Sequence, residues 1–475
     1  MKKFLALFLA VVIIVLTCVA CDLTDPSTNR DPDSTTTTTT TTTSAPAVSA
    51  LNGMGLEHFS IVYDADSDYA QRAAEYIKAE ILARTELDLV IRPDSQEVIG
   101  EYEIVVGETS REISTLLDAD TQNVQFAILA DDHRIALEGD YFIIAAAAYF
   151  FVETYVPADD FSATIPKEVS IHEPIKEEAK NFILLIGDGM GVNQTKLFEQ
   201  LKNTQGFGDK ESMFYGYYLP SQGFSRTDSL DGTTDSAAGG TALSSGLKTK
   251  NGYVGQNKNH QSVTSLTELA ASLGKSTAVM STEVSTGATP ASFSAHANNR
   301  SDADDILAGQ ATLTEQYGTI INCDYDIYDI AVIEEKVMAT LDALDNDEDG
   351  FFLMYEEAYI DKHCHSKNSV NTFRALIRFD QVIARFMEYA FYNPDTFILI
   401  TADHETGNLL PNAQGKFVYN SGDHSSQDVP VFAYGDGAEL FNSKTIENIQ
   451  IPQTIASFMG VHDFGDQTTY KPLTK

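Results

Sequence analysis

Short apolar runs alternate with longer amphipathic stretches in the C-terminal two thirds of the chain. The apolar runs span residues 182–186, 277–280, 351–354, 397–400 and 429–434, and the amphipathic stretches span residues 262–273, 303–317, 333–344 and 370–389. Buried strands that alternate with helices predict a largely parallel sheet with helices on both faces, and hence a three-layer α/β domain over residues 176–475. Ligands bind beyond the C-terminal ends of the strands in such sheets, so the polar residues there are the first candidates for a site.

Residues 51–175 show a second, smaller pattern of strands and helices. Strands are predicted at residues 58–63, 89–91, 102–107, 126–129 and 134–137, and helices at residues 69–83 and 141–155. This small α/β module resembles the domain that precedes the catalytic barrel in some hexosaminidase-type glycosidases. It contains no cluster of chemically active groups, so we interpret it as an accessory or spacing domain.

The first 21 residues predict an export signal. Lys2 and Lys3 precede an apolar run over residues 4–20. The end of this run resembles a bacterial lipobox with Cys21 as the lipidated residue, although Cys18 stands where leucine is usual. An uncleaved anchor helix is the alternative, because the run approaches the length that spans a bilayer. Either form predicts an exported protein, tethered to the membrane at the cell surface or in the periplasm.

Residues 22–50 predict a disordered linker. The segment contains an uninterrupted threonine run from Thr35 to Thr43 and has no apolar periodicity. Such a sequence cannot bury enough apolar surface to offset the entropy of ordering it. We expect it to hold the folded part away from the membrane.

The charge of the chain excludes one class of partner. With 69 acidic and 31 basic residues, the formal net charge is −38. Binding to a nucleic-acid backbone needs clustered Lys and Arg, so we expect no nucleic-acid partner. A small phosphorylated substrate needs only a local group of metal ions or arginine and stays open.

Metal-type side chains follow several of the predicted strands. They are Asp188, Glu356, Asp403 and His404, together with the pair Asp361 and His365 and with His424 in a polar loop. Taken singly, each has an ordinary explanation as a helix cap or a surface helix pair. Their convergence on one sheet edge favours a metal centre instead. Carboxylates with imidazoles suit zinc, and an all-oxygen corner suits magnesium.

Ser236 begins a run of very small residues and is the candidate nucleophile. A helix that starts there offers free backbone N–H groups and a positive dipole end to an anion. The alternative is that Asp235 or Ser236 only caps this helix. No Gly-x-Ser-x-Gly elbow surrounds the serine, which disfavours an acyl-transfer hydrolase. Because serine is a weak nucleophile at neutral pH, activation by a metal is the natural route.

The candidate nucleophile and the candidate metal ligands together resemble the alkaline phosphatase family. Asp235 to Thr241 is similar to the family's nucleophile signature, which is specific. The other family segments follow in order at Ile186–Gly191, Ala288–Pro290 with His296 and Arg300, Glu356–His365, Thr401–His404 and His424. The resemblance covers about residues 180 to 460 and includes a closing helix at residues 451–456.

The resemblance implies a role for each matching residue. One zinc ion would be held by Asp361, His365 and His424, a second by Asp188, Asp403, His404 and the Ser236 oxygen, and magnesium by Asp188, Thr289 and Glu356. Arg300 would grip two phosphate oxygens and Lys362 would reach the phosphate. The implied activity is hydrolysis of small phosphate monoesters through a phosphoserine at Ser236, with release of inorganic phosphate.

Two features depart from the family pattern. Gly287 stands where many relatives carry Asp or His near the third metal, so the identity of the third ion is left open. Only residues 405–423 separate His404 from His424, which is shorter than the insertion that many relatives use for substrate walls and dimer contacts. A homodimer therefore stays an open alternative.

Four other functions are alternatives to phosphate monoester hydrolysis. A sulfatase needs a Cys/Ser-x-Pro-x-Arg setting that Ser236 lacks. A nucleotide phosphodiesterase usually has a threonine nucleophile and lacks the third-site pair, here Thr289 and Glu356. A cofactor-independent phosphoglycerate mutase is cytoplasmic, against the export signal. A binding lipoprotein with an inactive phosphatase fold would not need the full ligand set.

The two cysteines of the predicted mature body allow two further interpretations. Outside the cell Cys323 and Cys364 are able to form a disulfide. Cys364 also stands between His363 and His365, so metal binding by its thiol is weighed as a less favoured alternative.

Overall fold

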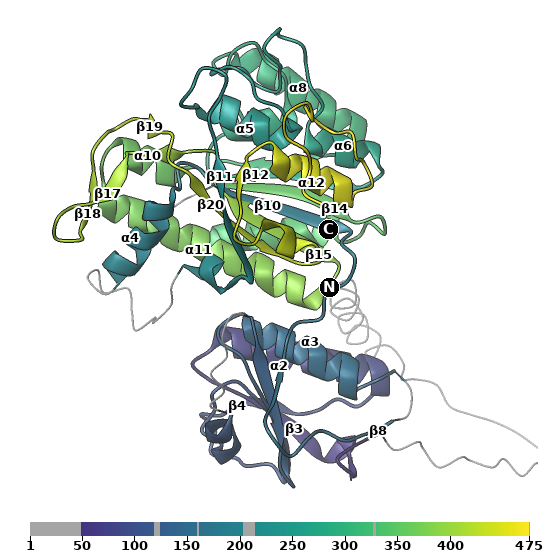
Figure 1. Cartoon of the computed structure of the whole chain (residues 1–475). Helices are drawn as coiled ribbons and strands as arrows, with labels where there is room; N and C mark the ends of the chain where they lie inside the picture. Colours follow the sequence, from purple (N-terminus) through teal and green to yellow (C-terminus); the bar gives the residue numbers. More distant parts are fainter. Residues whose placement is uncertain (1–48, 118–123, 159–160, 203–213, 326–328, 475) are drawn as a thin grey trace, which may run out of the picture.

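The computed structural model describes residues 49–474, apart from residues 118–123, 159–160, 203–213 and 326–328. The predicted export signal and nearly all of the predicted linker lie outside the described residues. Within the described residues, no helix combines the length and the apolar character needed to cross a membrane. Figure 1 shows a large α/β unit that carries helices α4 to α12 and a smaller unit that carries α2 and α3.

The large unit is built on an eight-stranded sheet in the order β13-β12-β14-β10-β15-β20-β11-β21. The strands are Ile320–Cys323, Ser276–Ser281, Phe351–Glu357, Asn181–Gly187, Thr396–Thr401, Val429–Tyr434, Ser221–Arg226 and Thr445–Glu447, in that order. Only β20 is antiparallel to its neighbours; every other pair in the sheet is parallel. The predicted mixed α/β class with a mostly parallel sheet is confirmed.

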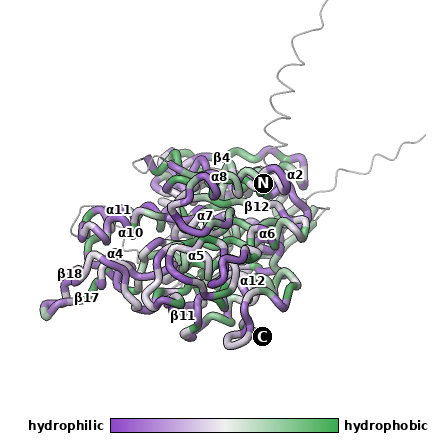
Figure 2. The backbone as a smooth tube through the Cα atoms, turned by 90° about the horizontal axis from the view of Figure 1, so that it is seen from above, coloured by the Kyte–Doolittle hydropathy of each residue, from purple (hydrophilic) through white to green (hydrophobic). Residues whose placement is uncertain are grey.

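Helices cover both faces of this sheet. One face packs against α4 (Val192–Lys202), α9 (Ile330–Leu344) and α11 (Ser369–Tyr392), and the other against α5 (Ser236–Ser245), α6 (Leu266–Ser272), α7 (Ala288–Ser294) and α12 (Gln450–Phe458). Side chains of the central strand β10 pack on both faces: Ile183 points to the face covered by α11, and Leu184 points to the face covered by α5 and α12. In the view from above in Figure 2, α5, α6, α7 and α12 lie near one another.

The remaining elements of the large unit are short, apart from α8. They are α8 (Ala303–Tyr317), α10 (Tyr359–His365), β16 (Glu405–Thr406), β17 (Leu409–Pro411), β18 (Phe417–Tyr419) and β19 (His424–Ser425). The helix predicted from residue 262 begins only at Leu266, because Ser265 and Glu268 form a capping box that fixes its first turn. The helix predicted at residues 262–273 is therefore wrong in its first four residues.

The smaller unit contains a six-stranded sheet in the order β4-β3-β5-β7-β6-β9. Its strands are Ile91–Pro93, Phe59–Tyr63, Tyr102–Val106, Arg134–Glu138, Phe126–Ala130 and Ser170–His172, and its helices are α2 (Asp68–Thr85) and α3 (Ile143–Tyr155). A three-stranded sheet joins β1 (Ala50–Leu51), β2 (Met54–Gly55) and β8 (Ser162–Ala163). The strand predicted at residues 89–91 is displaced to Ile91–Pro93, and Val90 is exposed.

The two units pack against each other through α2, α3 and α11. The Tyr76 ring lies 4.3 Å from the Tyr392 ring, centroid to centroid, and Arg72 Nε lies 2.7 Å from Glu388 Oε1. Buried apolar residues of both units belong to one continuous cluster. The predicted boundary between residues 175 and 176 falls between β9 and β10 and stays a prediction.

Candidate active site

Three adjacent strands of the large sheet end at the same place. The strands β14, β10 and β15 are parallel neighbours, so their C-terminal ends share one edge. Asp188 follows β10, Glu356 lies at the end of β14, and Asp403 and His404 follow β15. All four side chains are buried. The strand ends that the sequence predicts to carry metal ligands therefore lie close together.

His404 lies at the centre of one group of predicted ligands. Its Nε2 atom is 3.2 Å from Ser236 Oγ, 3.2 Å from Asp403 Oδ2 and 3.5 Å from Asp188 Oδ1. Burial lowers the pKa of His404 to about 4, so the ring is neutral at physiological pH. A neutral imidazole surrounded by carboxylates is the form that binds a metal.

Asp361, His365 and His424 form a second group beside the first. Asp361 and His365 lie one turn apart on α10, and His424 begins β19. His424 Nε2 is 3.2 Å from His365 Nε2 and 3.6 Å from Asp361 Oδ1. Ligand atoms of these three lie within 4.8 Å of one another, and the same holds for Asp188, Asp361 and His404. Asp361 therefore belongs to both groups.

Backbone carbonyl oxygens orient His365 and His424, which are both partly exposed. His365 Nδ1 lies 2.5 Å from the Gly422 carbonyl oxygen, and His424 Nδ1 lies 2.8 Å from that of Thr234. A carbonyl oxygen accepts only from an N–H, so each ring carries a proton on Nδ1 and turns Nε2 toward Asp361. In a neutral ring this arrangement leaves the Nε2 lone pair available to a metal ion.

Four buried oxygens of the predicted ligands have no hydrogen-bond partner among the described residues. They are Asp188 Oδ1, Thr289 Oγ1, Glu356 Oε1 and Asp403 Oδ2. Burial, followed by neighbouring carboxylates, raises the pKa of Asp188 and of Glu356 well above the usual range. Burying such oxygens without a partner is costly, and bound cations would remove the cost. The donor set therefore fits divalent metal ions.

The local structure at Ser236 separates the two explanations of its sequence motif. Asp235 is the N-cap of α5, because its carboxylate accepts a hydrogen bond from the Ala238 N–H at 2.9 Å. Ser236 is the first residue of the helix, and its hydroxyl faces His404 instead of capping. The cap and the candidate nucleophile are thus adjacent but distinct residues.

Gly239 allows α5 to approach the metal-type residues closely. A Cβ added there would lie 2.9 Å from the Asp403 carbonyl oxygen and 3.2 Å from Asp403 Cβ. Neither of these atoms is able to move away without a shift of the backbone. We therefore expect Gly239→Ala to push α5 from β15, to cost about 1–3 kcal/mol of stability, and to lower turnover by moving Ser236. Thermal unfolding and kcat measure the two effects. An unchanged kcat would contradict the expected displacement of Ser236.

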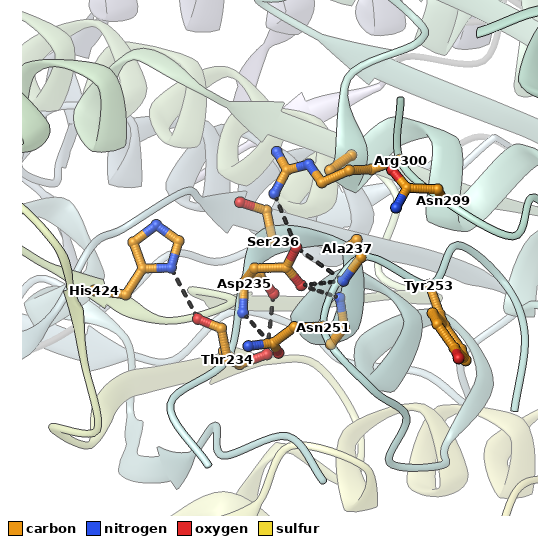
Figure 3. Close-up of polar contacts among 12 residues, drawn as sticks. Thr234, Asp235, Ser236, Ala237, Asn251, Tyr253, Asn299, Arg300 and His424 are labelled. Atoms are coloured by element: carbon orange, nitrogen blue, oxygen red, sulfur yellow. Dashed lines mark hydrogen bonds and ion pairs between the residues drawn. The ribbon is translucent and has the colours of Figure 1, made fainter. Parts of the chain in front are cut away.

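The two predicted phosphate-binding cations each lie beside an acid. Arg300 Nη1 is 3.2 Å from Asp235 Oδ2, and Figure 3 shows the guanidinium beside Asp235 and Ser236. Lys362 Nζ is 2.6 Å from Glu283 Oε2. Sequence reasoning missed both acids as partners. Asp235 lies within the nucleophile motif, so its proximity to Ser236 was a usable signal, whereas nothing in the sequence marks Glu283.

Three residues weighed from the sequence lie apart from this cluster. His296, in the same segment as Arg300, contacts Glu268 and the Gly255 carbonyl oxygen at 2.9 and 2.7 Å. Cys323 and Cys364 are free cysteines. Burial raises the pKa of the Cys364 thiol to about 12, so it is neutral, and it belongs to neither group of candidate metal ligands found among the described residues.

Comparison with known proteins adds an independent observation. The family model described as alkaline phosphatase matches residues 179–334 and 323–413. The chain belongs to the alkaline phosphatase family. The match spans the candidate nucleophile and all of the predicted metal ligands except His424.

Relatives of this alkaline phosphatase family support the assignment. The chain is 28% identical to "Alkaline phosphatase 3" of Bacillus subtilis over 317 residues, which is 54% of this chain and 68% of that protein. It is 26% identical to "Alkaline phosphatase 4" of the same organism over 53% of this chain and 66% of that protein. The alkaline phosphatase of the Antarctic bacterium TAB5 aligns in structure with a TM-score of 0.51 and 26% identity, covering 60% of this chain and 99% of that one. The family and the fold support hydrolysis of phosphate monoesters.

Proposed function

We propose that this chain is a metal-dependent phosphate monoester hydrolase that forms a phosphoserine at Ser236 and releases inorganic phosphate. One observation carries the proposal: the Ser236 hydroxyl lies 3.2 Å from His404 Nε2, next to buried carboxylate oxygens without a hydrogen-bond partner. A serine oxygen directed at a set of metal-type ligands matches the need of a weak nucleophile for activation.

The residues are assigned to two zinc ions and one magnesium ion. We assign Asp361, His365 and His424 to the first zinc, Asp188, Asp403, His404 and Ser236 to the second, and Asp188, Thr289 and Glu356 to magnesium. When bound, these ions would supply the positive charge that stabilises the attacking and leaving oxygens of an in-line displacement. A variant of the TAB5 alkaline phosphatase has Mg bound in a site called M3, which is in keeping with a magnesium position here.

The protein's own groups would hold the phosphate. The N-terminus of α5 directs free N–H groups and a positive dipole end toward an anion at Ser236. The Arg300 guanidinium is a planar fork suited to two phosphate oxygens, and Asp235 holds it over this helix end. Lys362 is the second candidate cation for the phosphate. Small phosphate esters are the proposed substrates.

A direct assay tests the proposal. Purified residues 49–475 should release phosphate from p-nitrophenyl phosphate at alkaline pH, and a chelator should abolish the release because the ligand set then lacks its cations. Addition of zinc with magnesium should restore it. Cleavage restricted to diesters or sulfate esters by the metal-loaded protein would contradict the proposed substrate class.

A further inference from the structure

Glu283 is an acidic side chain at the corner predicted to hold the third metal. It follows β12, whose neighbour β14 carries Glu356 at the same sheet edge. The residue before it, Thr282, donates its backbone N–H to the Glu356 carbonyl oxygen at 3.1 Å. Glu283 and Glu356 therefore lie at the same corner of the site.

Glu283 occupies the space over Gly287. A Cβ added at Gly287 would overlap Glu283 Oε1. The backbone of Gly287 has a φ of −55°, which any residue adopts, so its conformation does not require glycine. The absence of a side chain at position 287 is what makes room for the Glu283 carboxylate, directly before the helix that carries Thr289.

Glu283 is held on both sides by residues of the site. Its Oε2 atom accepts a hydrogen bond from Lys362 Nζ at 2.6 Å. Its backbone N–H donates to Ser281 Oγ at 3.0 Å, and Ser281 Oγ donates in turn to Glu356 Oε2. Glu283 is thus connected to a predicted phosphate-binding cation and to a predicted metal ligand.

We propose that Glu283 completes the third metal position, supplying from position 283 the carboxylate that glycine at position 287 does not provide. The corner then contains only oxygen donors, from Asp188, Thr289, Glu356 and Glu283. Oxygen donors alone suit magnesium, whereas zinc favours sites with nitrogen or sulfur. The same carboxylate positions Lys362. This inference rests on the proposed metal-dependent function and deepens it by naming an added partner of the magnesium ion.

Magnesium binding to the zinc-loaded protein tests the inference without measuring turnover. The readouts are the magnesium concentration that raises the thermal midpoint and the magnesium content after dialysis. We expect Glu283→Gln to weaken magnesium binding about 10- to 100-fold, as typical when a partner of a metal site is lost, and to leave the zinc content unchanged. Asp324→Asn is the matched control, because Asp324 is exposed next to this region and its φ of 66° suits asparagine.

A reciprocal exchange makes the test sharper. Gly287→Asp alone should weaken magnesium binding, because its side chain overlaps Glu283. The double variant Glu283→Ala with Gly287→Asp should regain binding close to that of the natural protein. Wild-type magnesium affinity in Glu283→Gln would overturn the inference, and so would an equal loss in Asp324→Asn. If magnesium binds as expected but no phosphate monoester is hydrolysed, only the proposed function fails.

Discussion

Replacement of Ser236 by alanine should abolish phosphoenzyme formation and lower kcat/KM for an aryl phosphate by about three orders of magnitude or more. The hydroxyl is the only group of Ser236 that faces His404, and alanine removes it without adding volume. Asp235 still caps α5 in this variant, so the thermal midpoint should change little. Phosphoenzyme trapped from labelled substrate at acidic pH, together with steady-state kinetics, provides the measurement.

Ser301→Ala is the matched control for this prediction. Ser301 is exposed next to Arg300, and its backbone N–H donates to Asn299 Oδ1, so removal of the hydroxyl leaves this contact in place. The control should keep both phosphoenzyme and turnover. Undiminished phosphoenzyme in Ser236→Ala would exclude Ser236 as the nucleophile, even if turnover fell for another reason.

The central strands were predictable from sequence because each is a continuous apolar run buried on both faces. Such runs correctly located β10, β12, β14 and β15. The strand β11 gave no such signal, since its buried positions are Ser221, Gly223 and Ser225. A Cβ added at Gly223 would overlap the Phe441 carbonyl oxygen, and such a close approach of a distant segment is a tertiary effect that no local pattern records.

The ligand positions were predictable because they lie at strand ends, where the parallel topology brings distant residues together. The partners of Arg300 and Lys362 were harder to predict. Glu283 and Lys362 are 79 positions apart in the sequence. Nothing in the residues around Glu283 indicates that the two side chains form a contact. The packing of the smaller unit on α11 was equally hidden. Periodicity shows that a helix face is apolar, but it does not tell which element covers that face.

Asp361→Asn should reduce the metal content of the protein more than any change confined to one ligand group. The carboxylate of Asp361 lies 3.3 Å from His365 Nε2 and 3.6 Å from His424 Nε2, and it also lies in the group with Asp188 and His404. Burial favours its neutral form, but hydrogen bonding by His365 holds its pKa at about 2, so it is charged at physiological pH. Asparagine keeps the size and removes the charge from both groups at once.

We therefore expect zinc binding in Asp361→Asn to weaken by about 100-fold or more at the first position, for the loss of a direct ligand. It should also weaken at the second position, because the Asp361 carboxylate that loses its charge lies within 4.8 Å of ligand atoms of Asp188 and His404. His365→Ala should weaken only one, because His365 belongs to a single group and is half-exposed. Asp423→Asn controls for the loss of one nearby charge, since Asp423 is exposed and its carboxylate accepts a hydrogen bond from the Ser421 hydroxyl. Zinc per chain after dialysis, measured by mass spectrometry, distinguishes the three variants. Equal zinc loss in Asp361→Asn and His365→Ala would mean that the charge of Asp361 does not contribute to zinc binding at the second position.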